Sequence, residues 1–342
     1  MVQPAFPDVT VILGDTRLPD SMKRGGRFDT EDFEAFERMK QALGSLVQYR
    51  FSFLDDHTTL LADLLARPPA FVLNLCDTGF RNNASQEAYI PALLEMLAVP
   101  YSGAPPGSLA LCYDKGFVRS LANTHGVPVP AEVYLQANDR LPLDNLRFPA
   151  LIKPSCGDGS IGITRGSLVS DVREARTYIE GLYRQFPGGA VLVQEFLSGR
   201  EYSIGLIGNP NMGFTVLPPL EVDYSGLDPR LPRILAYESK ADPASPYWTD
   251  IKFHQAKIDE STQQRLVDYS YRLFQRLGCR DYARFDFRAD ADGAIKLLEV
   301  NPNAAWCWDG KLNMMAGFAG HSYGAFLQLI VEAAQARVAA TR

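Results

Sequence analysis

In the first third of the chain, the pattern of hydrophobic and polar positions alternates between that of strands and that of helices. Short apolar runs typical of buried strands alternate with segments whose apolar positions keep helical spacing. The expected strands lie at 8–13, 50–54 and 70–75, and the expected helices begin near 30, 58 and 85. Alternation of this kind predicts a parallel sheet covered by helices, which is an α/β fold.

The rest of the chain mixes longer strands with amphipathic helices. Strands are expected at 148–155, 190–197 and 201–207, with another, containing Glu221, within 211–223. Helices are expected at 114–124, 170–183, 261–277 and 320–340. Residues 228–253 are rich in Pro, Asp, Ser and Lys and predict a long loop. Long loops in compact domains often act as lids, so we expect this segment to close over a ligand.

Residues 281–303 read as a β-hairpin, because both arms alternate with period two around an Asp-Gly turn. Alternation places Arg284, Asp286 and Arg288 on one face of the first arm. Glu299 and Asn301 share one face of the second. If the two faces coincide, two carboxylates and an amide oxygen converge, as Mg²⁺ prefers. The spacing alone leaves open an ordinary hairpin with a solvated charged face.

A glycine-rich loop follows the strand at 148–155. Its sequence is Cys-Gly-Asp-Gly-Ser-Ile-Gly-Ile (156–163), and Lys153 lies at its start. Glycines let backbone N–H groups approach an anion closely, so the loop is a candidate phosphate site. It lacks the Gly-Lys-Ser/Thr of a Walker motif and the spacing of a dinucleotide-binding motif, so plain turn glycines are an equal alternative.

Composition narrows the class of protein. A length of 342 residues predicts two or three domains. The net charge of −6, without basic clusters, argues against nucleic acid as a partner, and no apolar run is long enough for a membrane span. Five cysteines without a Cys-x-x-Cys pair predict reduced thiols and a cytoplasmic location, with neither a disulfide framework nor a zinc site.

Taken in order, the motifs resemble the ATP-grasp superfamily and, within it, the D-alanine–D-alanine ligases. The series is Asp114-Lys115, Ile152-Lys153-Pro154, the loop at 157–162, Gln194-Glu195-Phe196-Leu197, Ser198-Gly199-Arg200-Glu201, Lys240, Arg284-x-Asp286 and Glu299-x-Asn301. The segments 71–75, 85–103 and 217–225 support the closer match, and the resemblance covers nearly the whole chain.

The resemblance implies a three-domain architecture with the nucleotide between the central and C-terminal domains. The implied divisions are an N-terminal parallel-sheet domain at 1–112, a central lobe with the glycine-rich loop at 113–197, and a C-terminal lobe with the metal and catalytic site at 198–342. It also implies ATP and Mg²⁺, with Mn²⁺ as a substitute, and leaves a homodimer open. ATP would phosphorylate a small-molecule carboxylate, and an amine would attack the acyl phosphate to form an amide.

The same resemblance assigns a role to each motif residue. The phosphates would be held by Lys115, Lys153, Gly159 and Ser160, and Lys240 would reach the transferred phosphate. The adenine slot would be lined by Gln194, Glu195 and Leu197, and Glu201 would bind the ribose. Magnesium would be held by Asp286, Glu299 and Asn301, and Arg284 would stabilise the transition state. Alternatives stay open for three residues: Lys153 as a snorkelling side chain, Glu201 as a solvated strand-end charge, and Asp114 as a helix cap.

Departures from the family pattern concern the substrates. Lys240 is followed by Ala241 where the family has a tyrosine, although Tyr237 and Tyr247 are near, and residues 76–83 lack the family's histidine. After Asn301, the family's small residues and hydroxyl give way to a segment with two tryptophans and a lysine, and the candidate substrate residues there are Trp306, Trp308 and Lys311. The alternative places both tryptophans in the core and the lysine in solvent.

We therefore expect an ATP-dependent carboxylate–amine ligase whose amino-acid-like substrates are not two D-alanines. A D-alanine–D-alanine ligase is one alternative, and a catalytically inactive nucleotide-binding regulator is another.

Overall fold

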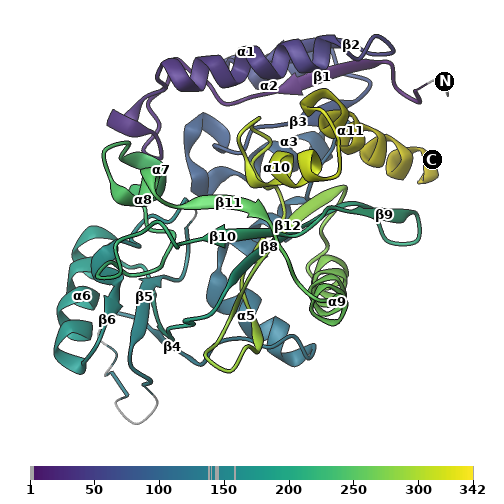
Figure 1. Cartoon of the computed structure of the whole chain (residues 1–342). Coiled ribbons are helices and arrows are strands. Elements are labelled where there is room, and N and C mark those ends of the chain that lie inside the picture. Colours follow the sequence, from purple (N-terminus) through teal and green to yellow (C-terminus); the bar gives the residue numbers. More distant parts are fainter. Residues whose placement is uncertain (1–3, 138, 140, 143–145, 158, 342) are drawn as a thin grey trace.

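A computed structural model describes residues 4–137, 139, 141–142, 146–157 and 159–341, and these form three β-sheets with helices around them (Figure 1). The first sheet is parallel, with the order β2-β1-β3, as the sequence predicts. Its elements are β1 (Asp8–Ile12), α1 (Thr30–Gly44), β2 (Arg50–Leu54), α2 (Leu60–Ala66), β3 (Val72–Asn74) and α3 (Tyr89–Met96). The helix expected from residue 85 starts later, because a short 3-10 turn, Ala84–Gln86, precedes it.

The second sheet is antiparallel and has four strands in the order β4-β7-β5-β6. Its strands are β4 (Glu132–Leu135), β5 (Ala150–Pro154), β6 (Leu168–Val169) and β7 (Val191–Glu195). Helix α6 (Val172–Gln185) packs against β5 and β6 and buries its apolar stripe there. Two helices, α4 (Pro106–Tyr113) and α5 (Lys115–Thr124), connect the first sheet to the second, and α4 was not predicted.

The third sheet has six strands, with the order β11-β10-β8-β12-β13 and β9 paired to β8. They are β8 (Glu201–Asn209), β9 (Gly213–Val216), β10 (Leu220–Asp223), β11 (Lys252–Gln255), β12 (Tyr282–Ala289) and β13 (Ile295–Asn301). The strand with Glu221 expected within 211–223 is confirmed as β10, and a second strand, β9, was not predicted; Leu217-Pro218-Pro219 separates the two. Helix α9 (Glu260–Arg276) is confirmed.

The segment 228–253 is more structured than its composition predicts. It contains α7 (Glu238–Ala241), α8 (Pro246–Thr249) and the start of β11. Ile234, Ala236 and Tyr247 are buried in the largest hydrophobic cluster and anchor the segment to the body of the protein. It is therefore no structureless loop, and its role as a lid stays a prediction.

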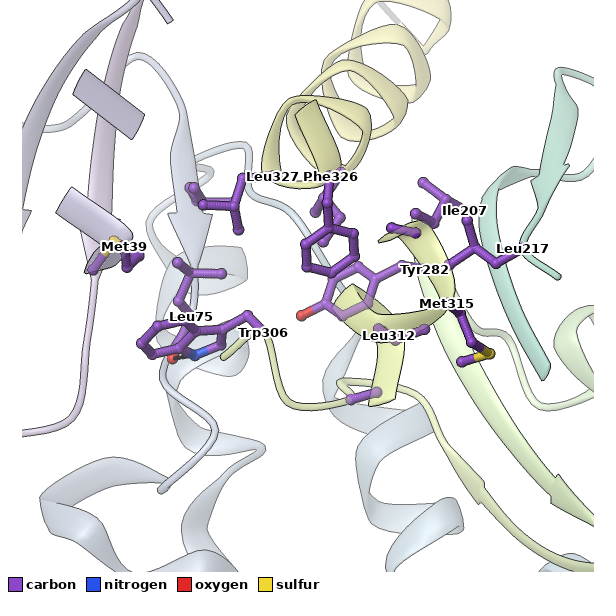
Figure 2. Packing of buried hydrophobic residues seen from close by; sticks show 14 of the residues in the cluster. Met39, Leu75, Ile207, Leu217, Tyr282, Trp306, Leu312, Met315, Phe326 and Leu327 are labelled. Atoms are coloured by element: carbon purple, nitrogen blue, oxygen red, sulfur yellow. Dashed lines mark hydrogen bonds between the residues drawn. The ribbon is translucent and has the colours of Figure 1, made fainter. Parts of the chain in front are cut away.

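The C-terminal helices α10 (Lys311–Phe318) and α11 (Tyr323–Ala340) join the first and third sheets. Phe326 and Leu327 of α11 belong to the same cluster as Met39 of α1 and Tyr282 of β12 (Figure 2). The two ends of the chain also meet, because the Gln335 side chain hydrogen-bonds the Phe6 backbone. Each sheet falls within one of the three predicted domain segments, and the division itself stays a prediction. No helix in the described part of the chain meets the length and apolarity of a membrane span.

Candidate active site

The hairpin β12–β13 brings the four predicted side chains together. Its antiparallel register pairs Arg284 with Asn301 and Asp286 with Glu299, so both pairs share one face of the sheet. The expectation that the two faces coincide is therefore confirmed. Because these residues lie on paired strands and not on loops, the backbone ladder fixes their spacing.

The two carboxylates of this face differ in their surroundings. Asp286 is buried, and it accepts hydrogen bonds from Ser203 Oγ at 2.5 Å and from Arg284 Nε at 3.0 Å. The Glu299 side chain is 34% exposed, and its nearest cations, Lys115 Nζ and Arg284 Nη2, lie 3.9 Å away. Burial raises the pKa of each carboxyl, but neighbouring cations outweigh it, so both pKa values are lowered and both groups are ionised at neutral pH.

This donor set fits a divalent cation. Asn301 donates from Nδ2 to Asp286 Oδ2 at 3.3 Å, which leaves its side-chain oxygen as an acceptor. Two ionised carboxylates beside an amide oxygen are the hard ligands that Mg²⁺ binds together with phosphates. Glu299 is the more accessible of the two carboxylates.

Two predicted phosphate-binding lysines approach the same face. Lys115 is the first residue of α5, and its ammonium donates to the Gly157 carbonyl in the glycine-rich loop. Lys153 in β5 is buried, and desolvation together with the cations Arg119 and Lys115 lowers its pKa to about 7. A snorkelling lysine would reach solvent, so that alternative for Lys153 is wrong. The cap alternative for Asp114 is confirmed, because its Oδ1 accepts from Phe117 N at 3.0 Å.

The glycine-rich loop touches the N-terminal part of the protein. Gly159 has a φ of 63°, and a Cβ there would lie 2.5 Å from the Met22 side chain, so only glycine fits without a shift. Ser160 also has a positive φ, of 63°, which is uncommon for a residue with a side chain. Residue 158 of this loop lies outside the described residues.

The residues predicted to bind adenine and ribose are buried or are bonded to other protein side chains. Gln194 donates to Glu132 at 3.1 Å, Glu195 accepts from Lys296 at 2.5 Å, and Leu197 is buried. Glu201 is buried, accepts from the Tyr224 hydroxyl at 2.8 Å and pairs with Arg288 at 3.2 Å. Glu201 is therefore not a solvated strand-end charge. The nucleotide roles of these residues stay predictions.

A cavity of about 280 Å³ lies between the hairpin and the N-terminal sheet. Lys240, Arg284 and Asn301 line it on the hairpin side. The remaining lining residues are Met22, Lys23, Asp77, Thr78, Ala84, Glu87, Leu109, Cys112, Tyr113, Gly159, Val300 and Pro302–Ala305. The sequence did not single out Lys23, Asp77 or Glu87 as site residues. The one usable signal was that Asp77 closely follows a parallel strand, at the sheet edge where ligands bind.

The three predicted substrate residues lie outside this lining, and the prediction for Trp306 is wrong. Its indole is 4% exposed, and Nε1 donates to the Leu75 carbonyl at 2.7 Å (Figure 2). The core removes that large apolar ring from water while satisfying its N–H group. Trp308 lies on the surface, 4.2 Å from the Arg38 guanidinium. Lys311 points to neither cavity nor solvent: its ammonium lies 3.1 Å from Ser203 Oγ and 3.8 Å from Asp286.

The two tyrosines near Lys240 are also outside the lining. The Tyr247 hydroxyl donates to the Pro232 carbonyl at 3.0 Å, and its ring is buried in the core. Tyr237 touches the glycine-rich loop through its backbone N–H, which donates to the Ile163 carbonyl at 2.7 Å. Neither side chain therefore occupies the place of the family's tyrosine at the cavity.

The chain resembles known proteins in sequence. Residues 125–332, more than half of the chain, match the family described as D-ala D-ala ligase C-terminus. An uncharacterized protein of Sinorhizobium fredii is 32% identical over 80% of this chain and 77% of its own. A D-alanine–D-alanine ligase of Cupriavidus pinatubonensis is 30% identical over 73% of this chain and 72% of its own.

The fold has a close counterpart among solved structures. A Bacillus anthracis D-alanine–D-alanine ligase, solved in complex with ATP, superposes with a TM-score of 0.72 at 20% identity and covers 98% of this chain and 99% of its own. That likeness confirms the expected ATP-grasp fold. The chain belongs to the D-alanine–D-alanine ligase family, the ATP-dependent carbon–nitrogen ligases of the ATP-grasp fold.

Proposed function

We propose that this ligase joins a carboxylate and an amine, other than two D-alanines, into an amide through an acyl phosphate. One observation carries the proposal: Lys240 and Arg284 line a single cavity beside the paired carboxylates Asp286 and Glu299. A carboxylate is a poor electrophile, and ATP supplies the phosphoryl group that activates it. Two anions must then meet, so cationic side chains are needed where they approach.

The chain supplies those cations in fixed positions. The Arg284 guanidinium is held against Asp286 by hydrogen bonds of 2.9–3.1 Å, so it faces the cavity with little freedom to reorganise. Such preorganised donors stabilise charge that develops in the transition state. We assign phosphate binding to Lys115, Lys153 and the loop at Gly159 and Ser160, and delivery of charge to the reacting carboxylate to Lys240.

Mg²⁺, or Mn²⁺ in its place, fits the cluster of Asp286, Glu299 and Asn301 and would screen the repulsion between phosphate and carboxylate. In the same assignment Gln194, Glu195 and Leu197 bind the adenine, and Glu201 binds the ribose.

The substrate proposal follows from the walls of the cavity. Its N-terminal side carries the charged side chains Lys23, Asp77 and Glu87, and such a wall suits a substrate with charge or polar groups of its own. The named activity of the Cupriavidus relative supports the alternative of a D-alanine–D-alanine ligase. The assembled Arg284, Asp286 and Glu299 argue against an inactive nucleotide-binding regulator. A cytoplasmic location and a homodimer stay predictions from the sequence.

A phosphate-release screen over amino acids, alone and in pairs, tests the proposal. We expect ATP hydrolysis to depend on a pair of substrates and to yield an amide product detected by mass spectrometry. Efficient D-alanyl-D-alanine formation would establish the alternative. ATP binding without any stimulated phosphate release would point to the regulator.

A further inference from the structure

The N-terminal wall of the cavity is acidic. Asp77 comes just after β3, at the carboxyl edge of the parallel sheet, and Glu87 lies ahead of α3. Open α/β sheets bind ligands in the crevice at this edge. Glu87 is held in place because its Oε1 accepts from Asn303 Nδ2 at 2.9 Å, and the Asn303 oxygen accepts from the Tyr282 hydroxyl at 2.5 Å.

The cation on this wall is already paired. Lys23 Nζ lies 2.6 Å from Asp32 Oδ1, and Asp20 is buried close enough to interact with both. Oδ2 of Asp20 has no hydrogen-bond partner among the described residues. Lys23 therefore faces three carboxylates, Asp20, Asp32 and Asp77. One ammonium cannot neutralise three carboxylates, and Glu87 adds a further negative charge to the wall.

Of the three carboxylates around Lys23, Asp77 is the one that lines the cavity. Within the described part of the chain no side chain donates a hydrogen bond to its carboxylate. Burial raises the pKa of Asp77 to about 6, and the Lys23 ammonium offsets only part of that rise. A carboxylate that is costly to keep ionised gains most from a cationic hydrogen-bond donor.

The opposite end of the cavity carries the reverse charge. Lys240 and Arg284 line it there, where the proposed reaction needs the carboxylate substrate. The cavity is thus dipolar, with cations at the reacting end and carboxylates at the N-terminal end. Its volume of about 280 Å³ is just below the usual range of ligand pockets, roughly 300–1,000 Å³, so the matching substrate is small.

We propose that the carboxylate substrate carries a protonated nitrogen on the end away from its reacting carboxylate, and that Asp77 and Glu87 bind this cation. The substrate class is a diamino acid or another small carboxylic acid with a distal ammonium or guanidinium group. This inference rests on the proposed ligase function and deepens it. Asp77 and Glu87 are specificity residues, because they contact the far end of the substrate and not the reacting atoms.

Isosteric substrate pairs test the inference directly. Ornithine against norvaline, and lysine against norleucine, differ in the distal ammonium but keep the α-amino group. With the unmodified protein, Mg-ATP and an amine partner, we expect kcat/KM for the basic member, in the preferred enantiomer, to exceed that of its neutral partner by about tenfold or more. Equal values for the two members would overturn the inference.

Substitutions in the N-terminal wall of the cavity provide a second test of the inference. Asp77→Asn should raise KM for the basic acid by about tenfold while KM for ATP stays unchanged. Asp77→Lys should reverse the preference for a basic carboxylate substrate, so that an acidic one such as glutamate is favoured. Asp309→Asn is the matched control, because Asp309 is an exposed carboxylate outside the cavity lining and its variant removes the same charge. Equal KM changes in Asp77→Asn and Asp309→Asn would also overturn the inference.

A binding measurement separates this inference from the ligase proposal. Thermal shift with ornithine and a non-hydrolysable ATP analogue reports binding without turnover. Suppose that ornithine, but not norvaline, stabilises the protein in an Asp77-dependent way, and that ATP itself gives no phosphate release; this result would support the inference and contradict the ligase reaction. Phosphate release from ATP without preference for the basic acid would support the ligase reaction and contradict the inference.

Discussion

The two ends of the cavity are built by different means. At the hairpin end, opposite charges lie close together: Arg284 contacts Asp286 within β12, and Lys115 of α5 lies near Glu299 of β13. At the N-terminal end, the carboxylates of Asp32 in α1 and of Asp77 after β3 lie near the Lys23 ammonium. The first arrangement is rigid and presents cations to the anionic groups of the reaction. The second has an excess of carboxylates, so a bound cation would compensate its charge.

Trp306 connects the two ends, and its removal should have the largest effect. Its indole bonds Leu75 at the end of β3 and packs against Phe36, with 5.9 Å between ring centroids. Trp306→Ala should lower the free energy of unfolding by about 3–5 kcal/mol, because a large buried ring leaves a cavity and an unpaired carbonyl.

Trp308→Ala is the matched control for that prediction. Trp308 is 39% exposed and stacks on Arg38, so its loss should cost less than about 1 kcal/mol. Urea denaturation followed by circular dichroism measures both variants. Equal losses would mean that Trp306 does not join the two ends.

Removing charge at the hairpin should stop turnover while the fold survives. Glu299→Gln and Asp286→Asn should each reduce kcat by about 10²–10³, the loss typical of one group that stabilises transition-state charge. Single-turnover phosphate release measures the rate, and Asp309→Asn serves as the control. A near-normal rate in either variant at saturating Mg²⁺ would show that the hairpin end of the cavity is not the catalytic one.

Mg-ATP should stabilise the folded protein without a contribution from Asp77. Ligand linkage adds about 2.7 kcal/mol when ATP is a hundredfold above its dissociation constant. Differential scanning fluorimetry should show this shift for the unmodified protein and for Asp77→Asn, but a smaller one for Lys153→Met. An unchanged melting temperature with millimolar Mg-ATP would contradict the nucleotide site.

The smallest effect is on the pH dependence of stability. Burial and the neighbouring cations lower the pKa of Lys153 to about 7, below its unfolded value of 10.5. Between these values the unfolded chain binds more protons, so stability should rise as the pH rises from about 7 to 10. Lys153→Met should flatten that rise in urea titrations at several pH values. An identical slope in the variant would show that Lys153 keeps its ordinary pKa.

Local patterns in the sequence determined the hairpin and most of the framework. Period-two alternation placed Arg284, Asp286, Glu299 and Asn301 correctly, because strand geometry fixes which side chains share a face. Strand–helix alternation likewise predicted the parallel first sheet. The order of the motifs then pointed to the family.

Elements without a clear period were missed or misjudged. Helix α10 buries Leu312, Met315 and Ala316, but its eight residues are too few and too uniformly apolar for a recognisable stripe. In the segment 228–253, the two helices have four residues each, which is too short for a helical pattern of apolar positions to be recognised. The composition of the segment therefore predicted only a loop.

Tertiary structure alone decided the N-terminal wall and the place of Trp306. Trp306 meets Leu75 across 231 residues of sequence, and Glu87 meets Asn303 across 216. Contacts over such separations leave no periodic signal, because the partners are brought together by the packing of α10 and α11 between two sheets. The sequence therefore determined the chemistry of the hairpin, whereas the packing of distant segments decided which charges face it across the cavity.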